Sequence, residues 1–247
     1  MSGELSQIYL LIAIPISLIR CICHSESMIP ATVTQTRAAF RERHISPRYS
    51  GPLHLTTTIS VSLLIAFFSA MMLEETRPLE WLTIPLTFLY ANLSEYLGHR
   101  GPMHHKTRFL GMIFNRHTIE HHAFFTEEAA SYDTTQDFKA VLFPPLMLLF
   151  FNGCFALPVG ALLYILISPN VAFLFVLTAI LYFLNYELLH FAYHMEPQSW
   201  VGRLPFMDRL RQHHLHHHNR RLMTRYNFNI TYPICDYLFA TVYKDSD

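Results

Sequence analysis

Thirteen of the sixteen histidines lie in four short clusters, and the clusters sit at the ends of long apolar stretches. A neutral imidazole can bind a transition metal ion without bringing a charged ligand into an apolar setting. The chemistry that these residues suggest is therefore metal chemistry at a membrane edge. The clusters are His99, His104 and His105; His117, His121 and His122; His190 and His194; and His213, His214, His216, His217 and His218.

The spacing within the clusters is helical. On an α-helix His117 and His121, four residues apart, lie on one face, and His122 points about 100° further round. His190 and His194 repeat the spacing of four. We therefore expect the helix that carries His117, His121 and His122 to supply ligands to two neighbouring metal ions.

The first and last clusters extend this pattern. His214 precedes His217 by three residues and His218 by four, and the two later side chains diverge by about 100°, which suits a pair of ions. A Gly-Pro pair separates His99 from His104, and proline disfavours helix in the residue before it. We expect a helix to end there and the chain to turn, so that both imidazoles face inward.

The composition is that of one membrane domain. Of 247 residues, 51% are hydrophobic and 15% are charged, and the mean hydropathy is +0.22. Eighteen basic residues balance eighteen acidic ones, and no basic stretch is interleaved with aromatic residues, which argues against nucleic acid as a partner. The four cysteines form no CxxC pair, so we expect reduced thiols rather than disulfides or a thiolate metal site.

Four apolar runs predict the elements that position the histidines. They cover residues 55–73, 82–98, 140–167 and 171–189. A helix of about 20 residues crosses the hydrocarbon core of a bilayer. If all clusters build one site, the chain must cross an even number of times between the second and third clusters. Residues 140–167 are therefore interpreted as one long span, kinked at its prolines or tilted.

Basic residues indicate which side of the membrane holds the histidines. The connections on the opposite side contain only Arg77, so the positive-inside tendency places the histidines in the cytoplasm. Residues 8–19 are apolar but short. We expect them to lie in the membrane interface or to cross the bilayer as a short span, and we do not expect a cleaved signal peptide. Arg37, Arg41, Arg43 and Arg48 are expected to face solvent and lipid headgroups. The basic residues on the histidine side are Arg100, Lys106, Arg108, Arg116, Arg203, Arg209, Arg211, Arg220, Arg221 and Arg225.

Four carboxylates near the clusters have two possible roles. Each could accept the second N–H group of a liganding imidazole and so orient the ring, or be an ordinary interfacial residue. The first role is somewhat favoured for Asp133 and Glu187. The four are Glu95, Glu120, Asp133 and Glu187.

Four ordered motifs resemble the fatty acid hydroxylase/sterol desaturase superfamily. They are HRGPMH (99–104), HTIEHH (117–122), HFAYH (190–194) and HLHHH (214–218), with apolar spans before the first and between the second and third. Residues 227–230 and 236–241 are similar to the family's closing N-F-G-x and D-x-L-F-G-T stretch, although Asn229 and Ala240 replace both family glycines. The resemblance covers roughly residues 55–243.

The resemblance implies an all-α integral membrane protein with about four core transmembrane helices and a cytoplasmic helical cap that holds a histidine-rich dimetal site. Residues 1–54 would form an N-terminal apolar segment and basic connection, and residues 55–247 the catalytic domain. Five histidines would bind each metal ion. The ligands carried over are His99, His104, His117, His121, His122, His190, His194, His214, His217 and His218.

The activity that this family implies is O2-dependent hydroxylation of a lipid C–H bond by two iron ions, with a fatty acyl or sphingolipid chain as the favoured substrate. Zinc could occupy the sites in an overproduced protein. The chain contains no dinucleotide fingerprint and no cysteine cluster for iron–sulfur, so electrons are expected from a separate cytochrome or ferredoxin.

Other functions remain open at this point. A sterol or carotenoid hydroxylase, or a desaturase, would carry the same motifs. A membrane metal transporter would need polar ligands near the middle of the bilayer, whereas these apolar runs carry charges only near their ends. A metal-buffering tract would explain residues 213–218 but not the other three clusters.

Overall fold

The computed structural model describes residues 31–244, and they are helical as predicted. Within this range the β pairing consists of one isolated bridge, between Thr126 and Ala129. The apolar segment 8–19 and the cysteines Cys21 and Cys23 lie outside the described residues.

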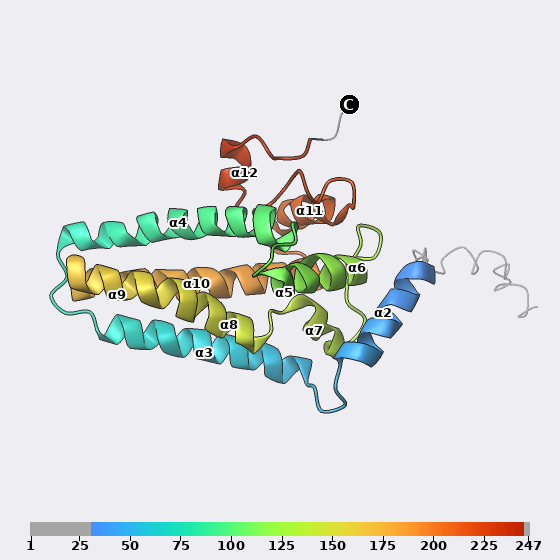
Figure 1. The fold of residues 1–247 in the computed structure, drawn as a ribbon, viewed down its shortest axis with the longest axis horizontal. Helices are drawn as coiled ribbons and strands as arrows, with labels where there is room; N and C mark the ends of the chain where they lie inside the picture. Colours follow the sequence, from blue (N-terminus) through green and yellow to red (C-terminus); the bar gives the residue numbers. More distant parts are fainter. Residues whose placement is uncertain (1–30, 245–247) are drawn as a thin grey trace, which may run out of the picture.

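Four helical columns lie side by side, with α10 (Pro169–Tyr193) packed against the other three (Figure 1). Half of the most apolar window of α10 is buried, against 22% of that of α3, which fits its central position. The predicted domain boundary after residue 54 falls inside α3 and stays a prediction. The other columns are α3 (Gly51–Met71), α4 (Thr83–Gly98) and the run of α8 (Pro145–Phe151), η5 (Asn152–Ala156) and α9 (Leu157–Leu166).

Three of the columns are long and apolar enough to cross a membrane. They are α3, the run Thr135–Leu166 and α10. The fourth predicted span corresponds to α4, which has only 16 residues. Its two ends are bounded by other helix types, because the 3-10 helix η1 (Pro78–Leu82) precedes it and a π-helical turn begins at His99.

Prolines interrupt the third column. Pro144 is extended and Pro145 begins α8, so the helix restarts there. The π-helical turn η5 then comes just before Pro158, which lacks the N–H group that would bond back to the preceding turn. The run Thr135–Leu166 therefore matches the prediction of one long helix that its prolines break and bend.

The two turns at the far end of the bundle are tied together by hydrogen bonds. The Asn170 side chain donates to the Glu74 carbonyl oxygen at 2.7 Å and accepts from the Glu74 N–H at 3.0 Å. The buried Glu80 carboxylate accepts from the Ser168 hydroxyl at 2.6 Å. These bonds connect the turn after α3 with the turn before α10, so both helical hairpins close at one end.

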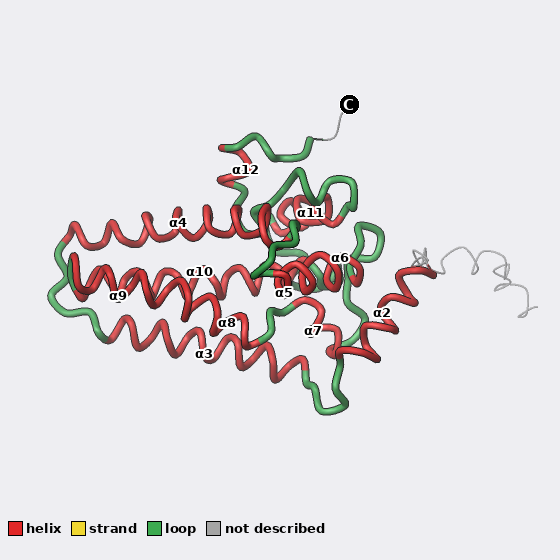
Figure 2. The backbone as a smooth tube through the Cα atoms, viewed as in Figure 1, coloured by secondary structure: helices red, strands yellow, loops and turns green. Residues whose placement is uncertain are grey.

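The short helices gather at the opposite end, together with all four histidine clusters (Figure 2). α4 ends at Gly98, and a π-helical turn, η2 (His99–Met103), follows with a kink at Gly101 just before Pro102, as the Gly-Pro pair predicts. The remaining elements here are α2 (Ala31–His44), α5 (Gly111–Phe114), η3 (Asn115–His121), α6 (His122–Phe124), η4 (Thr135–Asp137), α7 (Phe138–Val141), α11 (Met207–His218) and α12 (Ile234–Leu238).

The arginines of α2 correct one prediction. Arg43 and Arg48 are exposed, as expected of a surface facing solvent and headgroups. Arg37 is instead 1% exposed, and Arg41 forms salt bridges with Asp133 at 2.6 Å and Asp137 at 2.8 Å. The sequence prediction failed because charge alone does not reveal that α2 packs against the loop that follows α6.

The C-terminal stretch is organised by the buried carboxylate of Asp236. It accepts hydrogen bonds from the N–H groups of Phe228 at 2.9 Å and Asn229 at 2.7 Å, and from the Thr241 hydroxyl at 2.6 Å. The Asn229 side chain donates to the Asn92 carbonyl oxygen of α4 at 2.9 Å. This side chain therefore fills a structural role at one of the two positions where the family pattern has glycine.

The second such position predicts a stabilising substitution. Ala240 has a φ of 54°, which costs an L-residue about 1–2 kcal/mol. Ala240→Gly should remove this strain, but glycine also raises the entropy of the unfolded chain, which offsets part of the gain. We therefore expect a net stabilisation of up to about 1 kcal/mol. The melting temperature in detergent should rise by about 2–4 °C. The matched control, Ala38→Gly on the exposed face of α2, should lower it. A fall for Ala240→Gly would contradict the argument from strain.

Candidate metal centre

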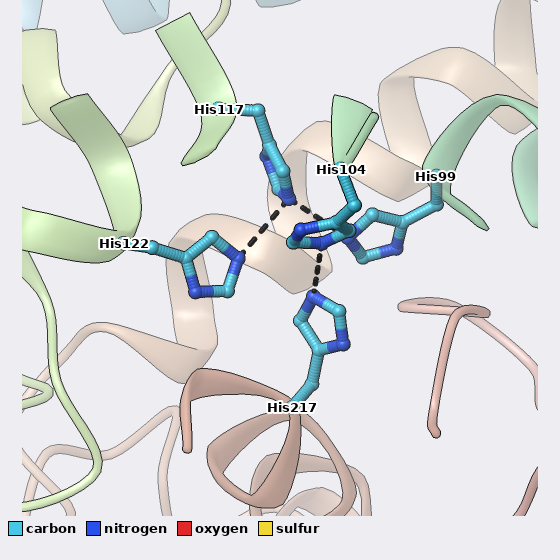
Figure 3. A group of neighbouring side chains, drawn as sticks. All are labelled: His99, His104, His117, His122 and His217. Atoms are coloured by element: carbon cyan, nitrogen blue, oxygen red, sulfur yellow. Dashed lines mark hydrogen bonds between the residues drawn. The ribbon is translucent and has the colours of Figure 1, made fainter. Parts of the chain in front are cut away.

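The structure brings the ten predicted histidines together in two groups of five. Within each group the five ligand atoms lie within 4.8 Å of one another, and every side chain is buried. Figure 3 shows the first group, in which the five rings point toward one another around a common centre. The first group is His99, His104, His117, His122 and His217; the second group is His121, His190, His194, His214 and His218.

The two groups share the helix formed by η3 and α6. An α-helical spacing predicts that His117 and His121 share one face of this segment. The segment is π-helical, and its i to i+5 hydrogen bonds bring residues five apart over one another. His117 therefore lies with His122 in the first group, and His121 points into the second.

α11 is also divided between the groups. His217 points into the first group, whereas His214 and His218, one helical turn apart, point into the second. The last turn of α10 supplies His190, and His194 follows directly after the end of that helix. Each group therefore draws on helices far apart in the sequence, which fixes the relative positions of the helix ends.

Backbone carbonyl groups orient half of the ten imidazoles. A carbonyl oxygen can only accept, so each of these rings carries its proton on Nδ1 and leaves Nε2 with a free lone pair. The pairs are His99 with Phe228, His121 with Ala140, His194 with Ala130, His217 with Tyr226 and His218 with Phe125.

The donor set fits a cation. The Thr118 hydroxyl donates to the Met103 carbonyl at 2.6 Å and accepts from His104 Nδ1 at 3.1 Å. His104 Nε2 is therefore also without a proton, yet it lies 2.9 Å from the unprotonated Nε2 of His217. Two lone pairs at this distance repel each other, and a metal ion bound between them would remove the repulsion.

Comparison with known proteins agrees with this geometry. The family model described as fatty acid hydroxylase matches residues 84–241, well over half of the chain. The chain belongs to the fatty acid hydroxylase family. The match confirms the resemblance drawn from the histidine motifs.

A solved structure described as full-length Scs7p, with only its hydroxylase domain visible, has the same fold as this family member. The TM-score is 0.56 at 18% sequence identity, and the match covers 77% of this chain and 66% of that chain. This chain thus spans slightly less than two thirds of the length of the chain it matches. No curated protein matches it.

Burial keeps the imidazoles of this hydroxylase family member neutral. It lowers the pKa of His99 and His218 to about 4 and the pKa of His104 to about 2. Burial also lowers the pKa of six further histidines well below the usual range. They are His117, His121, His122, His194, His214 and His217. A neutral imidazole is the form that binds metal, so both groups are ready to bind ions at pH 7.

These pKa values predict the pH dependence of the metal-free protein. An unfolded histidine takes up a proton near pH 6.5, whereas folded His99 and His218 do so only near pH 4. The unfolded chain binds more protons in this window, so the free energy of unfolding should fall as pH falls from 6.5 to 4. At pH 4 the free energy of unfolding should be lower by about 3 kcal/mol for each of the two residues.

Thermal unfolding of chelator-treated protein in detergent at pH 7.5, 6.5, 5.5, 4.5 and 4.0 would measure this loss. The matched variants His99→Gln and His218→Gln should each show a shallower fall of melting temperature with pH. A melting temperature that is independent of pH would contradict the assignment of neutral, buried rings.

None of the four predicted carboxylates forms a hydrogen bond with either group in the described residues. Glu95 accepts from Tyr182, Ile230 and Thr231, and so ties α4 to α10 and to the C-terminal stretch. Its role is to join elements around the site. The other three bind elsewhere: Glu120 contacts Arg116, Glu187 accepts from the Phe143 N–H, and Asp133 pairs with Arg37 and Arg41.

The orienting groups that sequence reasoning missed are carbonyls and the Thr118 hydroxyl. Carbonyl groups leave no signal in a sequence, but Thr118 falls inside the HTIEHH motif and was open to discovery. The three remaining histidines of the clusters lie outside both groups. His105 contacts the Arg100 carbonyl, His213 lies 3.3 Å from Asp236, and His216 lies 3.8 Å from Glu127.

A cavity of about 480 Å³ adjoins the first group. Its wall consists mainly of aromatic and aliphatic side chains from α4, α8 and α10, among them Tyr90, Phe150 and Phe183. His99 is part of the wall, so an apolar space reaches a histidine of the first group. For a member of this family the cavity is the candidate substrate site.

Proposed function

We propose that this protein hydroxylates a C–H bond of a lipid chain, a fatty acyl or sphingolipid chain being favoured, with two iron ions and O2. The contact between the apolar cavity and His99 carries the proposal. A cavity of about 480 Å³ lies in the range of small-molecule sites, and its apolar wall suits a hydrocarbon chain.

The ten histidines are proposed as the ligands, five to each ion. Five imidazoles per group would be more donors than the four with which structural zinc usually closes its shell, which favours an ion that takes more ligands. When bound, the two ions would activate O2 with two electrons from the external donor, so that one oxygen atom enters the C–H bond and the other leaves as water. Imidazole also suits zinc, so zinc is the expected contaminant in an overproduced protein.

The chain's own residues prepare and protect this site. The carbonyls of Phe228 and Tyr226 hold His99 and His217 with Nε2 directed inward. Tyr186, Phe143 and Phe183 line the cavity near the histidine end and exclude water from a bound chain. Positioning the lipid carbon beside the first group is therefore the contribution of α4, α8 and α10.

α4 is proposed as the fourth span. Its 16 residues reach about 24 Å, somewhat less than the hydrocarbon thickness of roughly 30 Å, and local thinning or the preceding η1 can make up the difference. Leu86, Leu89 and Leu97 are 65%, 51% and 57% exposed, which suits a lipid-facing helix. The basic residues around the histidine end favour a cytoplasmic metal site, with electrons from a separate cytochrome or ferredoxin.

Expression in membranes followed by metal analysis and lipid profiling tests this proposal. We expect about two iron ions per chain and new hydroxylated lipids when a competent electron donor is present. His121→Ala should abolish the products, whereas the control His105→Ala, outside both groups, should retain them. Well below two metal ions per chain, or an unchanged lipid profile, would contradict the proposal.

Two alternatives are distinguished by the same profile. An oxidised sterol or carotenoid would indicate a different substrate class. A product with a new double bond would indicate desaturation instead of hydroxylation. Vesicle uptake of metal without any lipid product would favour a transporter, although the histidines lie at one end of the bundle instead of its middle (Figure 1).

A further inference from the structure

We propose that a second cavity, separate from the first, binds the phosphoryl headgroup of an anionic phospholipid. This cavity has a volume of about 430 Å³ and lies between the end of α2, the start of α3, η3 and the segment that joins α7 to α8. It shares no lining residue with the cavity beside His99. We call it the basic cavity.

Positive charge in the basic cavity exceeds negative charge. Three cationic side chains line it, Arg48, Arg116 and Lys139, against one carboxylate, Glu120. Glu120 already pairs with Arg116 at 3.1 Å. Within the described residues Arg48 and Lys139 form no salt bridge, and the ammonium group of Lys139 lies 5.3 Å from the centre of the Tyr49 ring. Two cations thus remain available for an anion.

The polar groups beside these cations are already satisfied. His54 donates from Nε2 to the Phe143 carbonyl oxygen at 3.1 Å and accepts the Tyr49 hydroxyl at Nδ1 at 2.9 Å. Neither ring supplies a competing negative charge. A ligand of the basic cavity must therefore bring its own anionic group to Arg48 and Lys139.

The rest of the wall favours a lipid as the source of that anion. Phe40, Leu53, Leu142, Pro144 and Pro145 line the cavity, and Leu53 is 66% exposed. Leu53 lies in the first turn of α3 and Pro145 begins α8, so the cavity lies where two apolar columns start. A phospholipid would place its phosphate on the cations and its glycerol and upper chains on the apolar wall. Inorganic phosphate would use the cations alone.

The location suits a headgroup. Basic clefts between membrane helices bind anionic headgroups, and each lysine or arginine near the surface contributes about fivefold in affinity. The basic cavity lies at the same end of the bundle as the histidines, where the flanking residues are basic. The proposal therefore concerns a resident lipid beside the catalytic end, not the lipid chain in the first cavity.

Lipid retention by the full chain tests this inference. Protein would be reconstituted in nanodiscs of phosphatidylcholine with 20% phosphatidic acid, and bound lipids counted by native mass spectrometry. We expect retained phosphatidic acid, a roughly fivefold loss for Arg48→Gln or Lys139→Gln, and about a 25-fold loss for the double variant. Lys139→Arg should retain binding, and Arg43→Gln, an exposed cation of α2 outside the cavity, should match the unmodified protein.

Arg116 is not suitable for substitution. Its guanidinium donates to the carbonyl groups of Lys139 and Leu142, which flank the Ala140 carbonyl that accepts from His121. Replacing it would disturb the second group. Arg48 and Lys139 make no such contact, and circular dichroism would verify that their variants fold.

Three outcomes would overturn the proposal. They are equal retention of phosphatidic acid by the double variant, no preference for phosphatidic acid over phosphatidylcholine, and an equal loss for Arg43→Gln. Inorganic phosphate is a further probe. If millimolar phosphate bound to the protein in pure phosphatidylcholine discs and displaced phosphatidic acid, the cavity would be a phosphoryl site, but the proposal that a lipid supplies the phosphoryl group would be wrong. Binding is measured without turnover, so a failure here is distinct from a failure of the proposed hydroxylation.

Discussion

Replacing His217 or His218 with alanine is expected to remove one metal ion each, although the two residues are neighbours in the sequence. They diverge on α11, so His217 points into the first group and His218 into the second. Loss of a ligand leaves four imidazoles and an open position at one site only. Iron per chain should fall from about two to about one in either variant.

Both variants are expected to lose hydroxylation, because the proposed chemistry needs both ions. Disturbing groups that merely orient ligands costs about 10–100-fold in metal affinity or activity, so loss of a ligand should cost at least about 100-fold in rate. The rate would be measured as hydroxylated lipid formed per folded protein, with saturating electron donor. His216→Ala is the matched control, since His216 lies on the same helix outside both groups.

Double variants make this prediction sharper. His104→Ala with His217→Ala removes two histidines of the first group and should leave about one ion, as the single variants do. His217→Ala with His218→Ala affects both groups and should leave none. If that second pair still retained one ion, the two residues would belong to a single site and the assignment to separate groups would be wrong.

Arg37→Met is expected to empty the second group selectively. The buried guanidinium donates to the carbonyls of Phe124 at 3.0 Å, Ala129 at 2.6 Å and Ser131 at 2.9 Å, and pairs with Asp133 at 2.9 Å. One side chain from α2 thus fixes four points of the segment 124–133. The planar guanidinium presents several N–H donors in a fixed fork, which lets one side chain reach all of these acceptors.

This segment presents the acceptors for two histidines of the second group. The Phe125 carbonyl, next to one contact of Arg37, accepts from His218 at 2.8 Å. The Ala130 carbonyl, between two further contacts, accepts from His194 at 2.7 Å. When Arg37 is lost, these carbonyls are free to turn, and both imidazoles lose their fixed orientation.

The affinity of the second group for iron should fall about 10–100-fold in Arg37→Met, leaving about one ion per chain in the folded, monodisperse fraction. Arg37→Lys should give an intermediate loss, because an ammonium group keeps the charge but not the fork. Arg41→Gln removes salt bridges to Asp133 and Asp137 without touching the loop carbonyls and should keep both ions. Equal loss of both ions from Arg37→Met would indicate general unfolding instead.

The histidine spacing made much of this architecture predictable from the sequence. The four ordered histidine motifs resemble the fatty acid hydroxylase family, and that resemblance implied the all-helical class. The requirement that the clusters meet on one side led to one long span over residues 140–167, kinked at its prolines or tilted, and the structure has one such run, Thr135–Leu166. These predictions depend on the period of a helix and the length of a span, which are local properties of the chain.

The remaining features depend on tertiary fit. The π-helical turn places His117 with His122, and an α-helical spacing rule cannot foresee it. Arg37 lies on the face of its helix that carries buried Val33 and Phe40, and the prediction from charge alone did not use that spacing. The prediction of carboxylate partners for the imidazoles depended on side chains, which can be identified in a sequence. The acceptors that the structure uses are backbone atoms.

The carbonyl acceptors have a consequence for mutational scanning. Phe125, Ala130, Ala140, Tyr226 and Phe228 each present a carbonyl that directs an imidazole, and that oxygen stays when the side chain changes. An alanine scan would therefore find the histidines and overlook the carbonyl groups that orient five of them. Side-chain changes at these positions would report packing, since Phe125 and Phe228 are fully buried, whereas proline alters the backbone itself and would reveal the role of the carbonyl.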